Sequence, residues 1–297
     1  MDPELRRTLG FGLAELRRSD LARFFRVAEA DALFPEERLV ESFRATLVGL
    51  GIDLDAQPNV LLDVERRPQK SPRAFCAPVR VPDEVHLVVP PVGGRDDYLA
   101  LFHEGGHTEH FAWVDPALRW EFRQLGDYAV TEAFAFLLEH LVEEPEWLRR
   151  RLGIEDAGGL ASHNRAQRLV LLRRYCAKLD YELELHGGEH PVKDLPGRYA
   201  GALSEAVRVE WPAAMWLTDV DPAFYVANYL RAWSLETHVR ALLRERFGET
   251  WFEQLEAGAT LIELWRDGQR LAAEEIAAGL GVGALSFEAV LADLALA

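Results

Sequence analysis

Apolar and polar residues alternate along this chain with a period that changes twice. In the N-terminal part, apolar residues recur three or four positions apart, as on an amphipathic helix, at Leu9, Leu13, Leu16, Leu21, Phe24, Phe25, Leu39, Phe43 and Leu47. Asp20 and Pro35 interrupt the repeat. The pattern predicts two or three helices that end near residues 49–51.

Residues 59–90 have a different character. They contain three short runs rich in valine, leucine and aromatic residues, at 60–64, 74–79 and 85–89, and turns containing proline separate the runs. Such runs are typical of β-strands. We expect a small antiparallel or mixed sheet in which Pro78 lies at an edge or a bulge, because proline cannot donate to a ladder. An exposed edge strand could bind an extended peptide through main-chain hydrogen bonds.

The helical period returns after Gly93 and Gly94 and continues to the C-terminus. One helix is expected to begin at Asp96 or Asp97 as its N-cap, and another to run from about Asp127 to Val142. No linker, repeat or low-complexity segment divides the chain. The sequence therefore predicts one mainly α domain over residues 1–297, with a short helical region at 1–55 and a core at 56–297.

The first of these helices carries the most specific motif in the chain, H-E-x-x-H at residues 103–107. Residues four apart lie on one face of a helix, so both imidazoles can reach one Zn²⁺. Glu104 would lie beside the metal, where a general base is needed. Gly105 and Gly106 disfavour a helix interior, which indicates that another segment approaches the backbone closely. The motif predicts a zinc hydrolase.

A catalytic zinc site usually has a third protein ligand. Glu109 is two residues past His107 and points to another face of the helix. His110 shares the face of the motif but lies one turn too far along a straight helix. Glu132 belongs to the next long helix, which can bring its carboxylate in from the side. We favour Glu132.

These residues resemble the thimet oligopeptidase and oligoendopeptidase F family of zinc metallopeptidases. The family motif H-E-x-G-H-x-x-H is matched by His103, Glu104, Gly106, His107 and His110, and Glu132 follows His107 by 25 positions, the family's separation. The segment 70–76 resembles the family's approach to its substrate-side strands. Phe224-Tyr225 with Tyr229 resembles its tyrosine pair.

The resemblance covers roughly residues 55–297 and implies a helical zincin-like catalytic domain with the sheet next to the zinc helix. It implies one Zn²⁺ per chain, held by His103, His107 and Glu132. Glu104 would move the proton, and Tyr225 or Tyr229 would contact the substrate carbonyl. Tyrosines four apart on a helix are equally typical of a packed core. Family members commonly have a longer helical N-terminal portion than residues 1–55 provide.

Other residues are candidates for supporting roles. Ligating histidines normally donate their second N–H to a carboxylate or carbonyl, and Asp127 and Glu139 are the candidates for this partner. His110 is a candidate cleft residue, although a buried structural histidine fits equally well. Arg73 and Arg231 could bind a substrate carboxylate. A surface salt bridge is the alternative for Arg73.

Composition narrows the function further. The chain is 49% hydrophobic and 28% charged, as an ordinary globular protein is, and it has no apolar run long enough for a membrane span. Its formal net charge of −16 disfavours nucleic acid as a partner. Two cysteines and no signal-like N-terminus favour the cytoplasm.

The sequence thus predicts a zinc metallopeptidase that hydrolyses short peptides. Two alternatives remain open: a related zinc carboxypeptidase, and a catalytically weak or silent protein that binds peptides or a partner. Cleavage preference and oligomeric state are not determined by the sequence.

Overall fold

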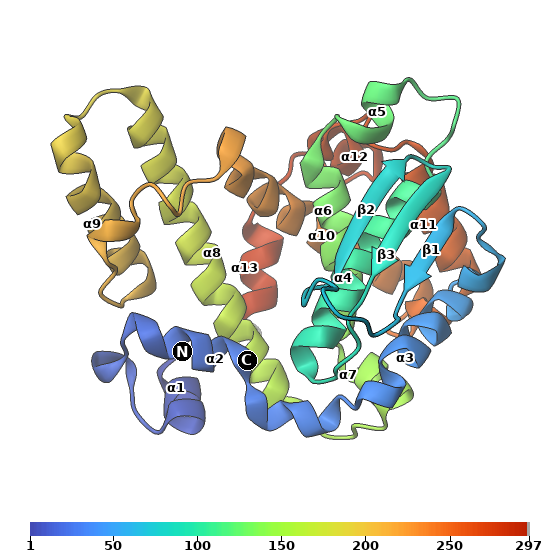
Figure 1. The fold of residues 1–297 in the computed structure, drawn as a ribbon, viewed down its shortest axis with the longest axis horizontal. Helices are drawn as coiled ribbons and strands as arrows, with labels where there is room; N and C mark the ends of the chain where they lie inside the picture. The colour runs from blue at the N-terminus through green and yellow to red at the C-terminus, as the bar shows by residue number, and fades with distance from the viewer. Residues whose placement is uncertain (296–297) are drawn as a thin grey trace. The chain divides into compact units, whose positions relative to one another are not determined.

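A computed structural model describes residues 1–295 and is mainly helical, with one three-stranded sheet (Figure 1). This confirms the predicted fold class. Contacts divide the chain into two compact units. Unit 1 contains Met1–Ala28, Gly158–Leu230 and the residues from Ala292, and unit 2 contains Glu29–Ala157 and Arg231–Leu291. The expectation of one catalytic domain over 1–297 stays a prediction.

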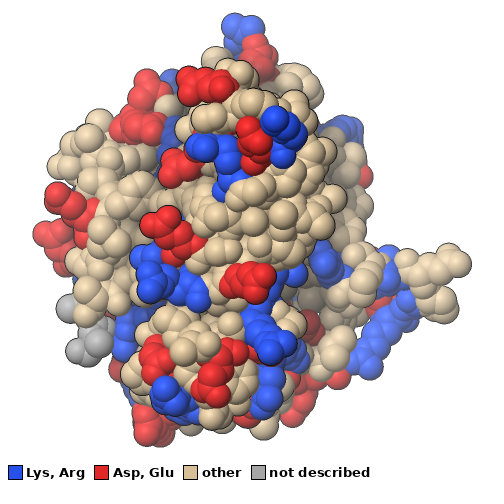
Figure 2. Space-filling view, turned by 90° about the vertical axis from the view of Figure 1, so that its left-hand side faces the viewer, with Lys and Arg blue, Asp and Glu red and all other residues tan. Residues whose placement is uncertain are grey.

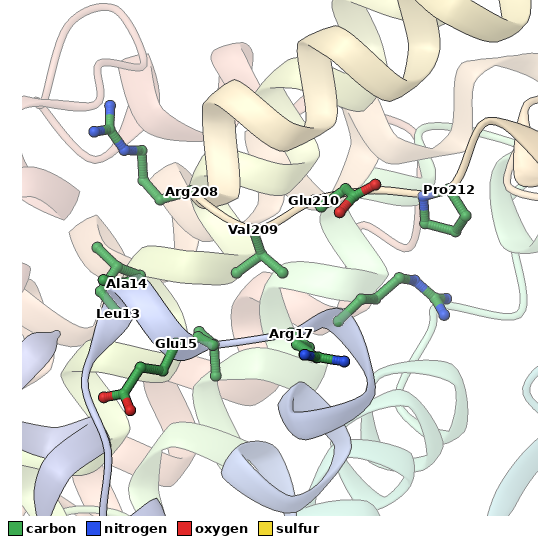
Figure 3. Close-up of a pocket in the computed structure, with 10 residues that line it drawn as sticks. Leu13, Ala14, Glu15, Arg17, Arg208, Val209, Glu210 and Pro212 are labelled. Carbon is green, nitrogen blue, oxygen red and sulfur yellow. The ribbon is translucent and has the colours of Figure 1, made fainter.

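Unit 1 is built from helices packed around an apolar cluster. Its helices are α1 (Asp2–Leu9), α2 (Arg18–Arg26), α8 (Gly158–Gly187) and α9 (Leu195–Val207). The cluster includes Leu5, Phe24, Tyr181, Tyr199 and Leu203. An open cavity of about 1050 Å³ lies between residues 13–18 and the segment 208–212 (Figure 3). None of the residues that line it is a predicted site residue.

Unit 2 contains the sheet, in the order β1 (Val60–Asp63), β3 (Glu84–Val88), β2 (Phe75–Arg80). Strand β1 pairs with β3 in parallel, and β2 pairs with β3 in antiparallel orientation. The three strands lie where the apolar runs predicted them. Pro78 lies in β2, one of the two edge strands, next to a register shift between Pro78 and Arg80, as the absence of its N–H requires.

The remaining helices lie wholly or partly in unit 2, and among them α4 packs on β2 and β3. Unit 2 contains α3 (Glu36–Gly49), α4 (Arg95–Ala112), α5 (Trp120–Gln124), α6 (Tyr128–Leu141), α7 (Pro145–Trp147), α11 (Leu255–Arg266) and α12 (Ala273–Gly279). Helices α10 (Tyr225–Phe247) and α13 (Glu288–Ala295) have residues in both units.

The two helices that carry the predicted site begin differently. Asp127 caps α6 as expected, since its Oδ1 accepts a hydrogen bond from the amide of Ala129 at 3.0 Å. The N-cap of α4 is Gly94, so the predicted cap at Asp96 or Asp97 was wrong. Asp97 instead accepts hydrogen bonds from the amides of Val92 and Gly93, which precede the helix.

The paired glycines of the motif lie at close contacts of α4. A Cβ atom at Gly106 would lie 2.5 Å from the carbonyl oxygen of Phe134 and 2.6 Å from the Cα of Ala135, both in α6. At Gly105 it would lie 2.4 Å from the ring of Phe43 in α3. The approach that the glycines indicated is therefore made by α6 on one side and α3 on the other.

Three further features are the lengths of the helices, the state of the cysteines and the distribution of surface charge. Within residues 1–295, no helix combines the length and apolar character that a membrane crossing needs. Cys76 and Cys176 are free thiols, and the cytoplasmic location stays a prediction. Figure 2 shows acidic and basic side chains interspersed over the face that it presents, so the excess negative charge is not gathered there.

A buried ion cluster joins α6 to α10 within unit 2. Glu236 is 1% exposed, and its Oε1 accepts a hydrogen bond from Arg240 Nε at 2.7 Å. Its Oε2 lies 3.2 Å from His140 Nδ1. Burial opposes the charge of Glu236, but Arg240 and His140 outweigh burial and hold the pKa of its carboxyl well below the usual range.

We expect Glu236→Gln to lower the free energy of unfolding by about 3 kcal/mol at pH 7, because it removes the buried negative charge that both Arg240 and His140 contact. A carboxyl with a lowered pKa stabilises the fold above its unfolded pKa of about 4.3, and this contribution is lost as pH falls further. The difference from wild type, measured by urea unfolding, should therefore shrink below about pH 4. Glu245→Gln, an exposed position on the same helix, should change stability little at either pH.

Candidate metal centre

Helices α4 and α6 bring together three residues that could bind one metal ion. His103, His107 and Glu132 each offer a ligand atom, and these atoms all lie within 4.8 Å of one another. Glu132 Oε2 lies 3.6 Å from His103 Nε2 and 3.8 Å from His107 Nε2. Tetrahedral zinc with bonds near 2.0–2.1 Å separates its ligand atoms by about 3.3 Å. The three residues therefore fit a zinc ion with only a slight closing of the side chains.

The second nitrogen of each imidazole is held by α6. His103 Nδ1 lies 2.7 Å from Glu139 Oε2, and His107 Nδ1 lies 2.8 Å from Thr131 Oγ1. These contacts orient both rings so that Nε2 faces Glu132, as second partners of ligating histidines do. Glu139 was predicted for this contact. Thr131 was missed, because a threonine beside Glu132 carries no distinctive sequence signal.

Glu104 is fixed by the neighbouring strand. Its Oε2 accepts a hydrogen bond from the backbone N–H of Cys76 in β2, at 2.8 Å. Burial raises the pKa of the Glu104 carboxyl above its ordinary value. The Glu104 side chain is thus held between α4 and β2, where its charge acts on that of His103. The contact with Cys76 depends on the packing of β2 on α4 and has no signature in the sequence.

Three carboxylates favour positive charge at His103. Burial alone would lower the pKa of its imidazole, but Glu139, Glu132 and Glu104 together raise it to about 9. Burial lowers the pKa of His107 well below its ordinary value, so this ring remains neutral and keeps a lone pair for a metal. A cluster that attracts a cation and offers neutral imidazole nitrogen suits a divalent ion.

His110 lies away from any surface that a substrate could reach. It is fully buried, and its Nε2 lies 3.1 Å from the carbonyl oxygen of Gly268. Burial lowers the pKa of His110 to about 4, so the ring is neutral at pH 7. The structure corrects the predicted substrate contact: His110 is a packed histidine, because the face of α4 beyond His107 turns into the core.

Asp127 and Arg231 bind each other rather than the predicted partners. Arg231 donates to both carboxylate oxygens of Asp127, at 2.8 and 2.6 Å, and its Nε donates to Glu274 at 2.8 Å. The amide of Ala273 also donates to Asp127, at 2.9 Å. Asp127 therefore fixes the start of α6 and contacts neither candidate ligand histidine. The guanidinium of Arg231 is already engaged by two carboxylates.

The remaining predicted site residues are Arg73, Tyr225 and Tyr229. Arg73 is exposed and lies two residues before the start of β2, and no ion pair of its guanidinium occurs among residues 1–295. Tyr225 and Tyr229 belong to unit 1. Their ring centroids lie 5.2 Å apart, and Tyr229 also stacks on Tyr175 at 5.5 Å. Substrate contact by Arg73 and oxyanion stabilisation by the tyrosines stay predictions.

Comparisons with known proteins identify the fold. No protein-family model and no curated sequence matches the chain. Among solved structures, it is similar to an M32 carboxypeptidase from Deinococcus radiodurans R1, with 17% identity, a TM-score of 0.65, and coverage of 99% of this chain and 68% of that one. It is also similar to Trypanosoma cruzi metallocarboxypeptidase 1, with 16% identity, a TM-score of 0.63, and coverage of 88% and 60%.

A third similar structure, BsuCP, has 15% identity and a TM-score of 0.63, with coverage of 99% of this chain and 62% of that one. The chain thus spans less than two thirds of two of these three structures and slightly more of the third. At this level of identity the likeness establishes the fold alone, a mainly helical architecture with a small sheet. The thimet oligopeptidase likeness is a finer assignment that rests on the motifs.

The hydrogen bond from His107 to Thr131 offers a direct test of the metal centre. We expect Thr131→Val to weaken zinc binding about 10- to 100-fold, since it removes the only partner of His107 Nδ1 among the contacts described above. Thr131→Ser keeps the hydroxyl and should bind zinc nearly as wild type does. Competition with a chromogenic chelator measures both affinities, and equal affinity of the valine and serine variants would contradict the expectation.

Proposed function

We propose that this protein is a zinc-dependent metallopeptidase that hydrolyses peptide bonds of short peptides, with one Zn²⁺ bound by His103, His107 and Glu132. The observation that carries the proposal is that the ligand atoms of these three side chains lie within 4.8 Å of one another, with Glu104 on the same helix fixed by the Cys76 amide. Similarity to structures named metallocarboxypeptidases supports the same class of reaction, although fold alone does not define function.

Each candidate residue would have its own role in the hydrolysis of the peptide bond. Zinc, when bound, would supply Lewis acidity and make a water nucleophile available near neutral pH. Glu104 would accept the proton of the attacking water and then donate it to the leaving amine. The Cys76 amide, by binding one oxygen of Glu104, leaves the other oxygen for that proton.

The oligopeptidase and carboxypeptidase forms of this function differ in what they require at the end of the peptide. A carboxypeptidase must bind a free terminal carboxylate, which calls for a cationic side chain. Arg231 is paired with Asp127 and Glu274, which leaves Arg73 as the exposed candidate. Of the two forms, we therefore favour cleavage of short peptides that does not require a free terminal carboxylate. Carboxypeptidase action is the second candidate.

Matched peptides with a free or an amidated C-terminus distinguish the two forms. For an oligopeptidase we expect kcat/KM to differ less than about threefold between them, because no charged contact is lost. A carboxypeptidase would lose at least about 100-fold on the amide, since an unpaired buried or bidentate charge contact is worth about 3 kcal/mol. Product masses from each digest identify the bond that is cleaved.

Glu104→Gln tests whether the protein is an enzyme or a silent binding protein. Loss of the general base should lower kcat by a factor of about 10² to 10⁴, whereas zinc content should stay at the wild-type value because the three candidate ligands are intact. Zinc is measured by elemental analysis and hydrolysis by a quenched fluorescent peptide. Identical behaviour of wild type and variant towards a peptide library would favour the silent alternative.

A further inference from the structure

Strand β2 is one of the two edge strands of the sheet and lies beside the candidate metal helix α4. In an antiparallel pair, the N–H and C=O of one residue point to the same side, and the side alternates from residue to residue. The N–H of Cys76 binds Glu104 and therefore points away from β3. By the same alternation the backbone of Pro78 also points to the free edge. Cys76 and Pro78 are thus the positions through which an added strand would pair with β2.

At Pro78, the free edge of β2 offers no backbone group that could pair with an added strand. Proline has no N–H to donate, and its carbonyl oxygen already accepts a hydrogen bond from Gln124 Nε2 at 2.7 Å. Arg123 Nη1 donates to the carbonyl oxygen of Val81, also at 2.7 Å. Helix α5 is therefore fastened by two consecutive side chains across the C-terminal end of β2 (Figure 1).

At Cys76, only one of the two backbone groups at the free edge of β2 is available for pairing. Its N–H is used by Glu104, but its carbonyl points the same way and can accept a hydrogen bond from an extended peptide. In the segment before Phe75, Ser71 Oγ bonds locally to the N–H and the carbonyl of Arg73, and among the hydrogen bonds of residues 1–295 no helix side chain donates to the backbone of residues 71–75 as Gln124 does to Pro78. A peptide placed against β2 thus finds a pairing partner at Cys76 and none at Pro78.

We propose that α5, through Gln124, blocks one end of the substrate-binding edge, so that a peptide bound along β2 can be extended in one direction only. This inference rests on the proposed peptidase function and specifies its substrate class: peptides with a short segment on one side of the cleaved bond. The same hydrogen bond that blocks the edge makes Gln124 a residue that determines specificity. It takes no part in the chemical step.

Two peptide series test the block. They share a cleaved core and are lengthened one residue at a time, one series from the N-terminus and the other from the C-terminus. With the zinc-loaded wild type we expect kcat/KM to fall beyond a limiting length in one series and to hold or rise in the other. Equal tolerance of extension in both series would overturn the inference.

The variant Gln124→Ala should remove the block. It frees the Pro78 carbonyl, and we expect kcat/KM for the first peptide beyond the limit to rise about tenfold, the effect of one gained hydrogen bond. Gln124→Met keeps the bulk of the side chain without its N–H donors and serves if the alanine variant folds poorly. An unchanged length limit in a folded Gln124 variant would overturn the inference.

Trp120→Ala is the matched control. Trp120 begins the same short helix and is 55% exposed, so its loss should leave the length limit unchanged. If the zinc-loaded wild type hydrolyses none of the peptides, the proposed function fails instead. The block is then measured as affinities of the same two series by fluorescence anisotropy, where wild type and Gln124→Ala should still differ about tenfold for the over-length peptide.

Discussion

The candidate site depends on how closely α4 and α6 approach each other. Gly106 allows this approach, because a side chain there would collide with the backbone of α6 at Phe134 and Ala135. With the two backbones in contact, Thr131, Glu132 and Glu139 reach the imidazoles of His103 and His107. Glycine weakens a helix interior by roughly 1 kcal/mol relative to alanine, and in exchange the site gains a second helix that supplies three polar groups.

Each element around the site has a separate task. Helix α4 provides the two imidazoles and Glu104, α6 provides the third candidate ligand and orients both rings, and β2 binds Glu104 through a backbone amide. The rings are oriented by protein atoms, so they do not depend on the metal for their direction. Such preorganisation keeps the cost of reorganisation low when an ion or substrate binds.

In the proposed function, the reaction chemistry and the substrate range would be set by different parts of unit 2. Hydrolysis by an H-E-x-x-H helix is compatible with cleavage inside a peptide or near its end. The edge of β2 would direct how a peptide lies, and this edge is partly occupied by the chain's own groups, Glu104 at Cys76 and Gln124 at Pro78. Similar catalytic helices can therefore serve peptidases with different length limits.

Spacing along single segments was enough to predict the helical regions, the strands and the two motif histidines, because residues three or four apart share a helix face and proline is tolerated at a sheet edge. Glu132 was reached from its place on the next long helix and its separation from the motif. Four features became visible only in the folded chain: Thr131 holds His107, Cys76 anchors Glu104, His110 is buried, and Arg231 pairs with Asp127. These contacts join segments distant in sequence, and their geometry depends on how helices and strands pack.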